Sequence, residues 1–423
     1  MTGAITNGST SGSEDWFDGS FADLCSLVSD QCDPAKTDHE IYVGLEHIDS
    51  GAFTISRHGS PKDVVSAKNR FKKNDILYGK LRPYLDKAVV AQQEGICSTD
   101  ILVFRPRENV CPLFALAHIH SNPFVEYAVQ TTHGVNHPRT SWAALKDFQC
   151  WIPPSSEQQR IAVVLWKIQK AVEIADAIVR NARDLKKSLL RRLFTQGLRG
   201  EPLKETEIGP LPESWDADMI ANRCDIRTST MSYGELLQAA EDKDGVLAHG
   251  VKVSDMNLAG NEIRFQSAKL VKRLPESVVK RRTIPAGAII FPKRGAAIAT
   301  NKKRLATTWT VLDPNLIAVV PGPEIVSGFL LNWFATLDLA SITEPGPTPQ
   351  LNKKNVAPLR FPKPQKDEQR EIADIVETID RKIDIHESKK RSLQDLFKTT
   401  LHKLMTAQIR LNDLDIDTSE VTA

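Results

Sequence analysis

The sequence predicts an α/β (α+β) protein in which two mixed α/β domains are separated and followed by long helices. Two internal matches predict this arrangement. The stretch SSEQQRIAVVLWKI at 155–168 is matched by KDEQREIADIVETI at 366–379, with a constant offset of 211. The stretch SEDWFDGSFADLC at 13–25 is matched by PESWDADMIANRC at 212–224, with an offset of 199. Each copy therefore holds a globular segment followed by a helical one.

The repeats and local breaker residues place the expected boundaries. Pro153-Pro154 before the first helical segment and Gly197 and Gly200 after it are typical of helix starts and ends. We expect a flexible N-terminus at 1–15, a globular domain at 16–153, a coiled-coil helix at 154–200, a second domain at 201–363, a second coiled-coil helix at 364–410 and a C-terminal tail at 411–423.

Short β-rich runs predict the strands of the two globular segments. Each run is bounded by Gly, Pro, Asn or Asp, as strands commonly are. In both copies an apolar helical run and then a polar, glycine-containing loop follow the strands. The strand runs are NDILYGKL, TDILVFRP, GAIIFPKR and PNLIAVVP, and the helical runs are FALAHIH and FLLNWFA.

Apolar residues recur in steps of four and three through both helical segments, which is the pattern of a coiled-coil seam. Because each seam is one-sided, we expect the two helices to bury their seams against each other. Packing of each helix onto the globular parts is the alternative. The expected seam consists of Ile161, Leu165, Ile168, Val172, Leu185 and Leu189 in the first helix and Ile372, Val376, Ile379, Ile383, Leu396 and Leu404 in the second.

The composition is that of a globular protein without membrane segments. The 423 residues are 41% hydrophobic and 26% charged, with a net charge of +2. No apolar run reaches the roughly 18 residues that a membrane helix requires, and the polar N-terminal run lacks the apolar core of a secretory signal. We therefore expect a cytoplasmic protein with no membrane partner. The six cysteines show no CxxC spacing, which disfavours a metal knuckle or a disulfide framework.

Positive charge is concentrated in one segment of each copy. Residues 262–304 hold twelve Lys and Arg against two acids, and residues 57–87 hold nine against three. Lys and Arg release condensed counterions when they neutralise phosphates, so two such segments favour a polyanionic partner. A solvated charged surface is the alternative for either segment alone.

Catalytic motifs are absent from the sequence. It contains neither the phosphate-binding loop of an ATPase nor a glycine-rich cofactor fingerprint after a strand. The run SNPFVEY at 121–127 lacks the second proline of the base-holding motif of adenine methyltransferases. His118 and His120 have no third ligand nearby, so we expect ordinary histidines there. We therefore predict no catalytic residue, no metal site and no cofactor on this chain.

The duplicated arrangement resembles the specificity (S) subunit of type I restriction-modification systems. The resemblance covers nearly the whole chain after about residue 14. The first domain departs from it by lacking an LPxxW opening and keeping only Trp16. The residues that carry it are PPSSEQQRIA with LKKSLLRRLFTQGL, their repeats KPQKDEQREIA and LFKTTLHKLMTAQI, GPLPESW at 209–215 and ILYGKLRPYLDK at 76–87.

The resemblance implies a DNA-reading role for a chain that is not itself an enzyme. In that family each globular domain is a target recognition domain that reads one half of a bipartite sequence in double-stranded DNA. The helices pair antiparallel, set the spacing and dock modification subunits, which methylate adenine. S-adenosylmethionine, ATP and Mg are expected only on partner subunits of the methyltransferase and endonuclease complex. Whether a restriction subunit is among the partners stays open.

The candidate DNA-binding residues are chosen by chemistry, since recognition domains vary within the family. Arg reads guanine best, Asn and Gln read adenine, and Lys mostly meets phosphate. Trp16 and Trp215 are assigned to the core instead. The candidates are Lys80, Arg82, Tyr84, Asn136, His137, Arg139 and Thr140 in the first copy, and Lys293, Arg294, Lys302, Lys303, Arg304, Gln350, Asn352 and Lys353 in the second.

Two other classes of protein remain as alternatives. One is a non-enzymatic coiled-coil scaffold whose basic surfaces are incidental. The other is a DNA methyltransferase or nuclease with a cryptic site. Salt-dependent, sequence-selective binding of duplex DNA would exclude the first, and activity of the purified chain would support the second.

Overall fold

The computed structural model of the chain describes residues 16–134, 136–344, 348–412 and 414–419. The segment expected to be a flexible N-terminus, 1–15, lies outside the described residues. The chain divides into two compact units: the first holds Met1–Asp176 with Lys389–Ala423, and the second holds Ala177–Ser388. Each unit thus combines a globular part with the start of one long helix and the end of the other.

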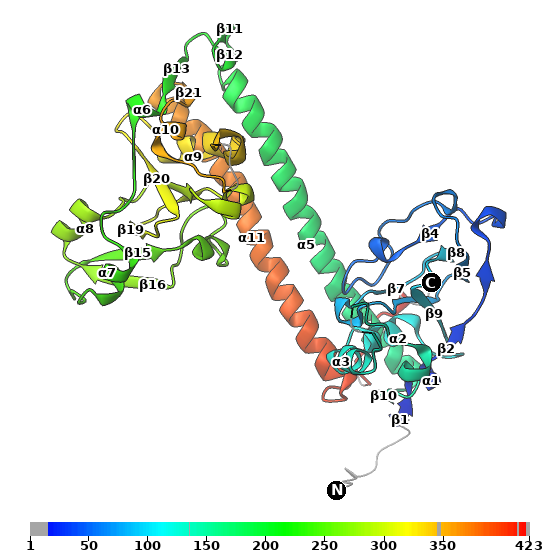
Figure 1. Cartoon of the computed structure of the whole chain (residues 1–423). Helices are drawn as coiled ribbons and strands as arrows, with labels where there is room; N and C mark the ends of the chain where they lie inside the picture. The colour runs from blue at the N-terminus through cyan, green and yellow to red at the C-terminus, as the bar shows by residue number, and fades with distance from the viewer. Residues whose placement is uncertain (1–15, 135, 345–347, 413, 420–423) are drawn as a thin grey trace. The chain divides into compact units, whose positions relative to one another are not determined.

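The first unit is built on two small sheets (Figure 1). One sheet has the antiparallel order β2 (Cys25–Val28), β9 (Ile101–Pro106), β6 (Ile76–Gly79) and β7 (Ala88–Val90), and the other has the order β3 (Gln31–Cys32), β5 (Lys68–Phe71), β8 (Gly95–Cys97) and β4 (Tyr42–Val43). Strand β1 (Phe17–Ser20) pairs with β10 (Gln149–Ile152). The short helices are α1 (Phe21–Leu24), α2 (Pro112–Ile119), α3 (Asn122–Gln130) and α4 (Trp142–Leu145).

The second unit repeats this plan. Its first sheet has the order β14 (Cys224–Arg227), β20 (Leu316–Pro321), β17 (Ile289–Pro292) and β18 (Arg304–Leu305), the counterpart of β2-β9-β6-β7. A second sheet joins β16 (Leu270–Leu274), β15 (Val246–Val251) and β19 (Trp309–Leu312), and two pairs are β13 (Asp216–Met219) with β21 (Arg360–Lys363) and β11 (Leu203–Thr206) with β12 (Gly209–Pro212). The short helices are α6 (Ile220–Arg223), α7 (Tyr233–Gln238), α8 (Glu276–Arg282), α9 (Ser327–Thr336) and α10 (Lys353–Val356).

The predicted strands and apolar helices are confirmed. The four β-rich runs form β6, β9, β17 and β20, and the two apolar runs form α2 and α9. The strands are apolar because they are buried: every residue of β6 and of β17 is inaccessible or nearly so. The shared strand order shows that the internal repeat is a duplicated fold.

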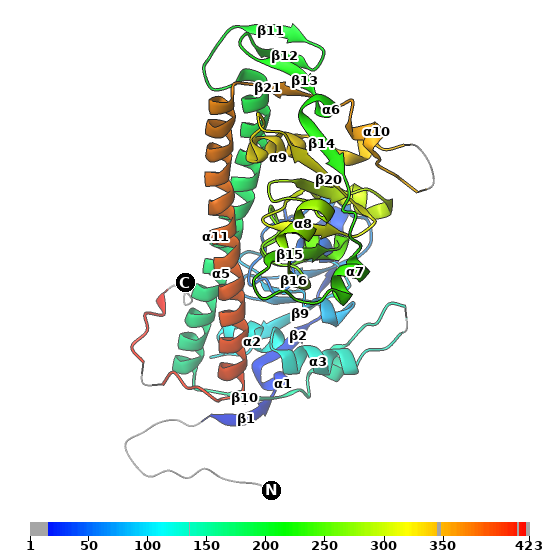
Figure 2. The same ribbon diagram turned by 90° about the vertical axis from the view of Figure 1, so that its left-hand side faces the viewer.

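Two long helices, α5 (Ser155–Gln196) and α11 (Lys366–Met405), follow the two globular parts and run side by side (Figure 2). Within the second unit Arg183, Lys186 and Arg199 of α5 or just after it contact Glu387, Asp380 and Glu371 of α11, so that the residue numbers run in opposite directions. The helices are therefore antiparallel. Gly197 ends α5 with a φ of 62°, the left-handed conformation that glycine adopts without strain.

The helix seam differs from the predicted one after its first half. Ile161, Leu165, Val172, Ile372, Val376, Ile383 and Leu404 are buried, and Ile168, Leu189 and Ile379 are half-buried. The prediction is wrong for Leu185 and Leu396, which are 59% and 49% exposed. The buried path on α5 instead passes through Val179, Ala182 and Leu190, with Lys186 between the last two. On α11 the half-buried Phe397 replaces its exposed neighbour Leu396.

The ends of both helices also pack into the globular cores, so the two expected ways of burying the seam coexist. In the first unit Leu401 and Leu404 of α11 join the same core as Phe21 and Phe114. In the second unit Leu190 and Leu193 of α5 join the core that holds Trp215 and Phe329. Each globular core is therefore completed by the far end of the helix that starts in the other unit.

Candidate DNA interface and helix junctions

In the first unit, a turn after β6 and a polar loop meet along one edge. The amide of Arg82 donates to the carbonyl of Pro138 at 2.8 Å, and the amide of Thr140 donates to the carbonyl of Lys80 at 3.1 Å. Arg82 is exposed and has a φ of 53°, and Tyr84, in the turn Pro83–Leu85, is 55% exposed. We call residues 80–84 and 136–140 the first edge.

In the second unit, the same backbone contacts recur after β17. The amide of Gly295 donates to the carbonyl of Pro349 at 2.9 Å, and the amide of Leu351 donates to the carbonyl of Lys293 at 2.9 Å. Arg294 is exposed and pairs across the edge with Gln350. Burial, together with the neighbouring Arg294 charge, lowers the pKa of Lys293. We call residues 293–295 and 349–353 the second edge.

The two edges correspond residue by residue. The turn of each edge is also held by the backbone of the residue before the adjacent strand. The amide of Lys80 donates to the carbonyl of Asp100 at 3.0 Å, and the amide of Lys293 donates to the carbonyl of Asn315 at 2.8 Å. Arg139 and Gln350 occupy the same position in the paired loops, opposite Leu81 and Arg294. The structure thus brings together candidates that lie about sixty residues apart in each copy.

Several predicted DNA-binding residues are buried or have side chains that bind other groups of the protein. Thr140, Lys303 and Arg304 are 3%, 7% and 9% exposed, so their side chains cannot reach a partner without rearrangement. The Lys303 ammonium donates to the carbonyl of Leu337 at 2.6 Å, and burial lowers its pKa to about 8. The Lys302 ammonium binds the Asn257 side chain. Asn352 is half-buried at the start of α10, whereas Asn136, His137 and Lys353 are exposed.

The repeated Glu-Gln pair at the start of each long helix joins helix to domain. Glu157 accepts the indole N–H of Trp16 at 2.8 Å and the amide of Leu411 at 2.8 Å. Glu368 accepts the indole N–H of Trp215 at 3.0 Å and the amide of Leu198 at 3.0 Å. In each unit one carboxylate therefore binds the tryptophan at the start of the globular part and a backbone amide that follows the end of the other long helix.

The glutamine after each glutamate makes a second repeated contact. The Gln158 Oε1 accepts the amide of Cys111, which precedes α2, at 3.0 Å. The Gln369 Oε1 accepts the amide of Val326, which precedes α9, at 2.9 Å. These side chains satisfy buried backbone donors at helix starts, which would otherwise be costly to leave unpaired. The sequence showed the repeat of Glu-Gln and Trp but gave no signal for the backbone partners.

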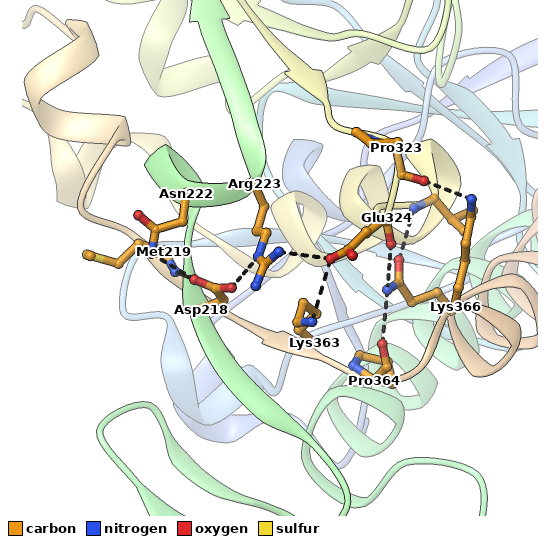
Figure 3. A network of polar contacts seen from close by, with 11 residues as sticks. Asp218, Met219, Asn222, Arg223, Pro323, Glu324, Lys363, Pro364 and Lys366 are labelled. Carbon is orange, nitrogen blue, oxygen red and sulfur yellow. Dashed lines mark hydrogen bonds and ion pairs between the residues drawn. The ribbon is translucent and has the colours of Figure 1, made fainter.

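The second unit adds an outer ionic network at its junction (Figure 3). Arg223 contacts Asp218 and also donates to Glu324 at 2.8 Å, while the Lys363 ammonium lies 3.9 Å from Glu324. Burial acts to raise the pKa of Asp218, but hydrogen bonds from Arg223 and other neighbours outweigh it and lower the pKa. In the first unit the corresponding strand pair exposes Phe17 and Trp151.

Each unit also has a hollow beside the far end of its incoming helix. The hollow in the first unit has a volume of about 350 Å³ and that in the second about 290 Å³. The lining residues that come from the far end of the long helix are related by the repeat offset of 211. They are Gln394, Phe397, Lys398, Leu401 and His402 of α11 in the first unit, and Arg183, Lys186, Lys187, Leu190 and Arg191 of α5 in the second. The second hollow is much more basic.

Comparisons with known proteins agree with this architecture. A family model described as the type I restriction modification DNA specificity domain matches residues 279–395. A Methanocaldococcus jannaschii protein provisionally named as the type I restriction enzyme MjaX specificity subunit is 21% identical over 417 residues, covering 94% of each chain. The type I restriction enzyme EcoDI specificity subunit of Escherichia coli is 28% identical over 189 residues, 43% of this chain and 40% of that protein. The crystal structure of a type I S subunit from M. genitalium has the same fold, with a TM-score of 0.60 at 15% identity over 95% of this chain and 97% of that chain.

Fold and site together define a duplicated α/β protein, in which each of two copies of one module is followed by a long helix and the two helices are antiparallel. The similarity to the M. jannaschii relative extends along nearly the full length of both chains, so it includes both copies. The chain is thus similar to type I restriction-modification specificity subunits over nearly its whole length, and it shares the fold of one of them. None of the helices among the described residues is both long and apolar enough to span a membrane.

Proposed function

We propose that this chain recognises a bipartite DNA target, with each globular domain reading one half. The carrying observation is the duplicated edge, in which equivalent backbone hydrogen bonds hold exposed polar side chains on the basic segment of each copy. Exposed Arg82 and Arg294 can donate to guanine or phosphate, and Lys80 and Lys293 to phosphate. In the scaffold alternative these edges would make no contact with DNA.

The test is neutralisation of the second edge. Lys293→Ala with Arg294→Ala should weaken binding of duplex DNA and reduce its salt dependence, because each lost phosphate contact removes about one unit of the log-log slope. The matched control is Arg381→Ala with Lys382→Ala, which removes two exposed basic side chains of α11. Fluorescence anisotropy at several salt concentrations gives both quantities. Equal losses in the two double variants would point to non-specific attraction and favour the scaffold alternative.

The helices have two roles in this proposal: they set the spacing of the half-sites, and they dock the modification subunits. Inserting four residues between Ala175 and Ala182 lengthens α5 by roughly 6 Å, about two base pairs. The assembled complex should then methylate the same half-sites with a changed spacer. Methylome sequencing that found the spacer unchanged in an active enzyme would exclude the spacing role.

The two hollows are the proposed docking sites, one for each modification subunit, because they occupy equivalent places in the two units. Lys187 and Lys398 are equivalent, exposed positions in them. Lys187→Glu alone should reduce the stoichiometry from two modification subunits to one, and Lys187→Glu with Lys398→Glu should abolish docking. Analytical ultracentrifugation of the mixed subunits measures this. We also propose a cytoplasmic location. Because the proposal places no cofactor on this chain, the chain without partner subunits should transfer no methyl group from labelled S-adenosylmethionine to DNA.

A further inference from the structure

Arg139 in the first edge is held rigidly by a carboxylate. Its Nε donates to Oδ1 of Asp100 at 3.0 Å, and its Nη2 lies 3.3 Å from Oδ2 of the same side chain. This fork-to-fork geometry fixes the plane of the guanidinium. The Arg139 side chain is nevertheless 44% exposed.

The carboxylate leaves part of the guanidinium available. An arginine has five N–H donors, and the contact with Asp100 uses one on Nε and one on Nη2. The two donors of Nη1 and the second donor of Nη2 stay available on the outer side of the fork. A guanine offers two acceptors, O6 and N7, in the major groove, which match such a pair of donors. Because Asp100 already restricts the side chain, less rotamer entropy is lost on binding.

The second edge has a different side chain at the same place. Gln350 corresponds to Arg139, and Asn315 corresponds to Asp100, since both pairs are set by the same backbone hydrogen bonds. Within the described residues the Gln350 side-chain amide makes no hydrogen bond. Gln350 is half-buried, so it stays partly accessible to solvent. A glutamine side chain can accept a hydrogen bond from the adenine N6 amino group through its Oε1 and donate one to N7 through its Nε2, which is the bidentate pattern for adenine.

From these observations, and on the basis of the proposed function, we infer that residues 139 and 350 are equivalent base readers. Arg139, positioned by Asp100, reads guanine in the half-site of the first domain. Gln350 reads adenine at the corresponding place in the half-site of the second domain. Asp100 is a positioning residue and touches no base.

Exchanging the two readers is the test. In the assembled methyltransferase, Arg139→Gln should change one base pair of the first half-site from guanine towards adenine and leave the second half-site unchanged. Gln350→Arg should make the opposite change in the second half-site only. A wrong base pair costs about 1–3 kcal/mol, so binding of substituted duplexes should differ by roughly 5- to 150-fold. Methylome sequencing and competition binding with single-substituted duplexes give the two readouts.

Further variants separate reading from folding and from general DNA attraction. Asp100→Asn should keep the guanine preference but lower its discrimination, whereas a purely structural Asp100 would weaken binding to all duplexes equally. Arg107→Gln is the control, since Arg107 donates to the Ala22 carbonyl outside the edge. If Arg139→Gln folds, binds DNA and keeps the original first half-site, the assignment is wrong although the proposed function stands. If Arg139→Gln does not fold, Gln350→Arg with an unchanged second half-site overturns the assignment equally. If the wild-type chain showed no sequence-selective binding of duplex DNA, the proposed function itself would be refuted.

Discussion

The junctions between domain and helix in the two units share their buried contacts and differ in their outer ones. In both, a glutamate accepts an indole N–H and a backbone amide, and a glutamine accepts the amide before an apolar helix. Among the described residues, the second unit adds the Arg223–Glu324 ion pair, whereas in the first unit the Arg410 guanidinium lies 3.1 Å from the Glu157 carboxylate. A buried backbone donor that loses its acceptor is costly, whereas exposed ion pairs contribute little, so the outer contacts can differ between the copies.

The largest expected effect concerns the two tryptophans. Trp215 is fully buried, so Trp215→Ala should destabilise the second unit by about 3–5 kcal/mol through lost packing. Trp16 is only partly buried, so Trp16→Ala should cost the first unit roughly half as much. Urea unfolding, followed by hydrogen exchange in each unit, measures both. Equal losses would show that the two junctions are energetically alike despite their different exposure.

The next effect tests the shared glutamines. Gln158→Ala and Gln369→Ala each leave a buried backbone amide without its acceptor, which should cost about 1–3 kcal/mol in either unit. Gln196→Ala, at the exposed end of α5, is the control and should change little. The same unfolding measurement applies. A large loss in one unit only would mean that the glutamine contact is structural in that unit alone.

A smaller effect should appear as a pH dependence of the first unit. Burial acts to raise the pKa of Glu157, but hydrogen bonds from Arg410, Trp16 and Leu411 outweigh it and hold the pKa below its ordinary value of 4.5. A lowered pKa means that this stabilisation is complete above about pH 4.5 and is lost as the pH falls through the folded-state value. Thermal unfolding between pH 7 and pH 3 should therefore show a steeper decline for the wild type than for Glu157→Gln. Parallel curves would refute this contribution.

The smallest effect is expected from the outer network. Arg223→Ala removes a guanidinium that is 37% exposed, and exposed ion pairs usually contribute less than about 1 kcal/mol. The loss should shrink further at high salt, where exposed charges are screened. A loss as large as that of Gln369→Ala, measured by the same urea titrations, would show that the network is as important as the shared contacts.

The sequence predicts most of the fold because its signals are local. The runs that form β6 and β17 are apolar and bounded by breaker residues, and the repeat offset identifies the two long helices. The predicted seam of α5 fails at Leu185, because Leu185 fits the apolar pattern while Lys186 takes the buried-side position. Lys186 is tolerated there since its ammonium lies 2.5 Å from Asp380 on the facing helix, a partner that the sequence of α5 does not contain.

The candidate interface was predictable in part. Lys80, Arg82 and Arg139, or Lys293 and Gln350, could be chosen by residue type and by their basic surroundings. Their assembly into one edge depends on backbone hydrogen bonds between segments far apart in the chain, which leave no pattern in composition. Lys303 and Arg304 look like surface bases in sequence, and only the packing around them shows that their charged groups bind carbonyl oxygens.

The exchange of helix ends imposes an order on synthesis. Residues 177–388 of the second unit are contiguous, so it can fold as soon as that stretch has left the ribosome. The first unit, although its globular part is made earliest, also includes the end of α11, and the Leu411 amide that binds Glu157 is made only after the whole of the second unit. Of the two units, the one whose globular part is translated first is therefore completed second, and truncation of the chain before Leu411 should destabilise the N-terminal globular part.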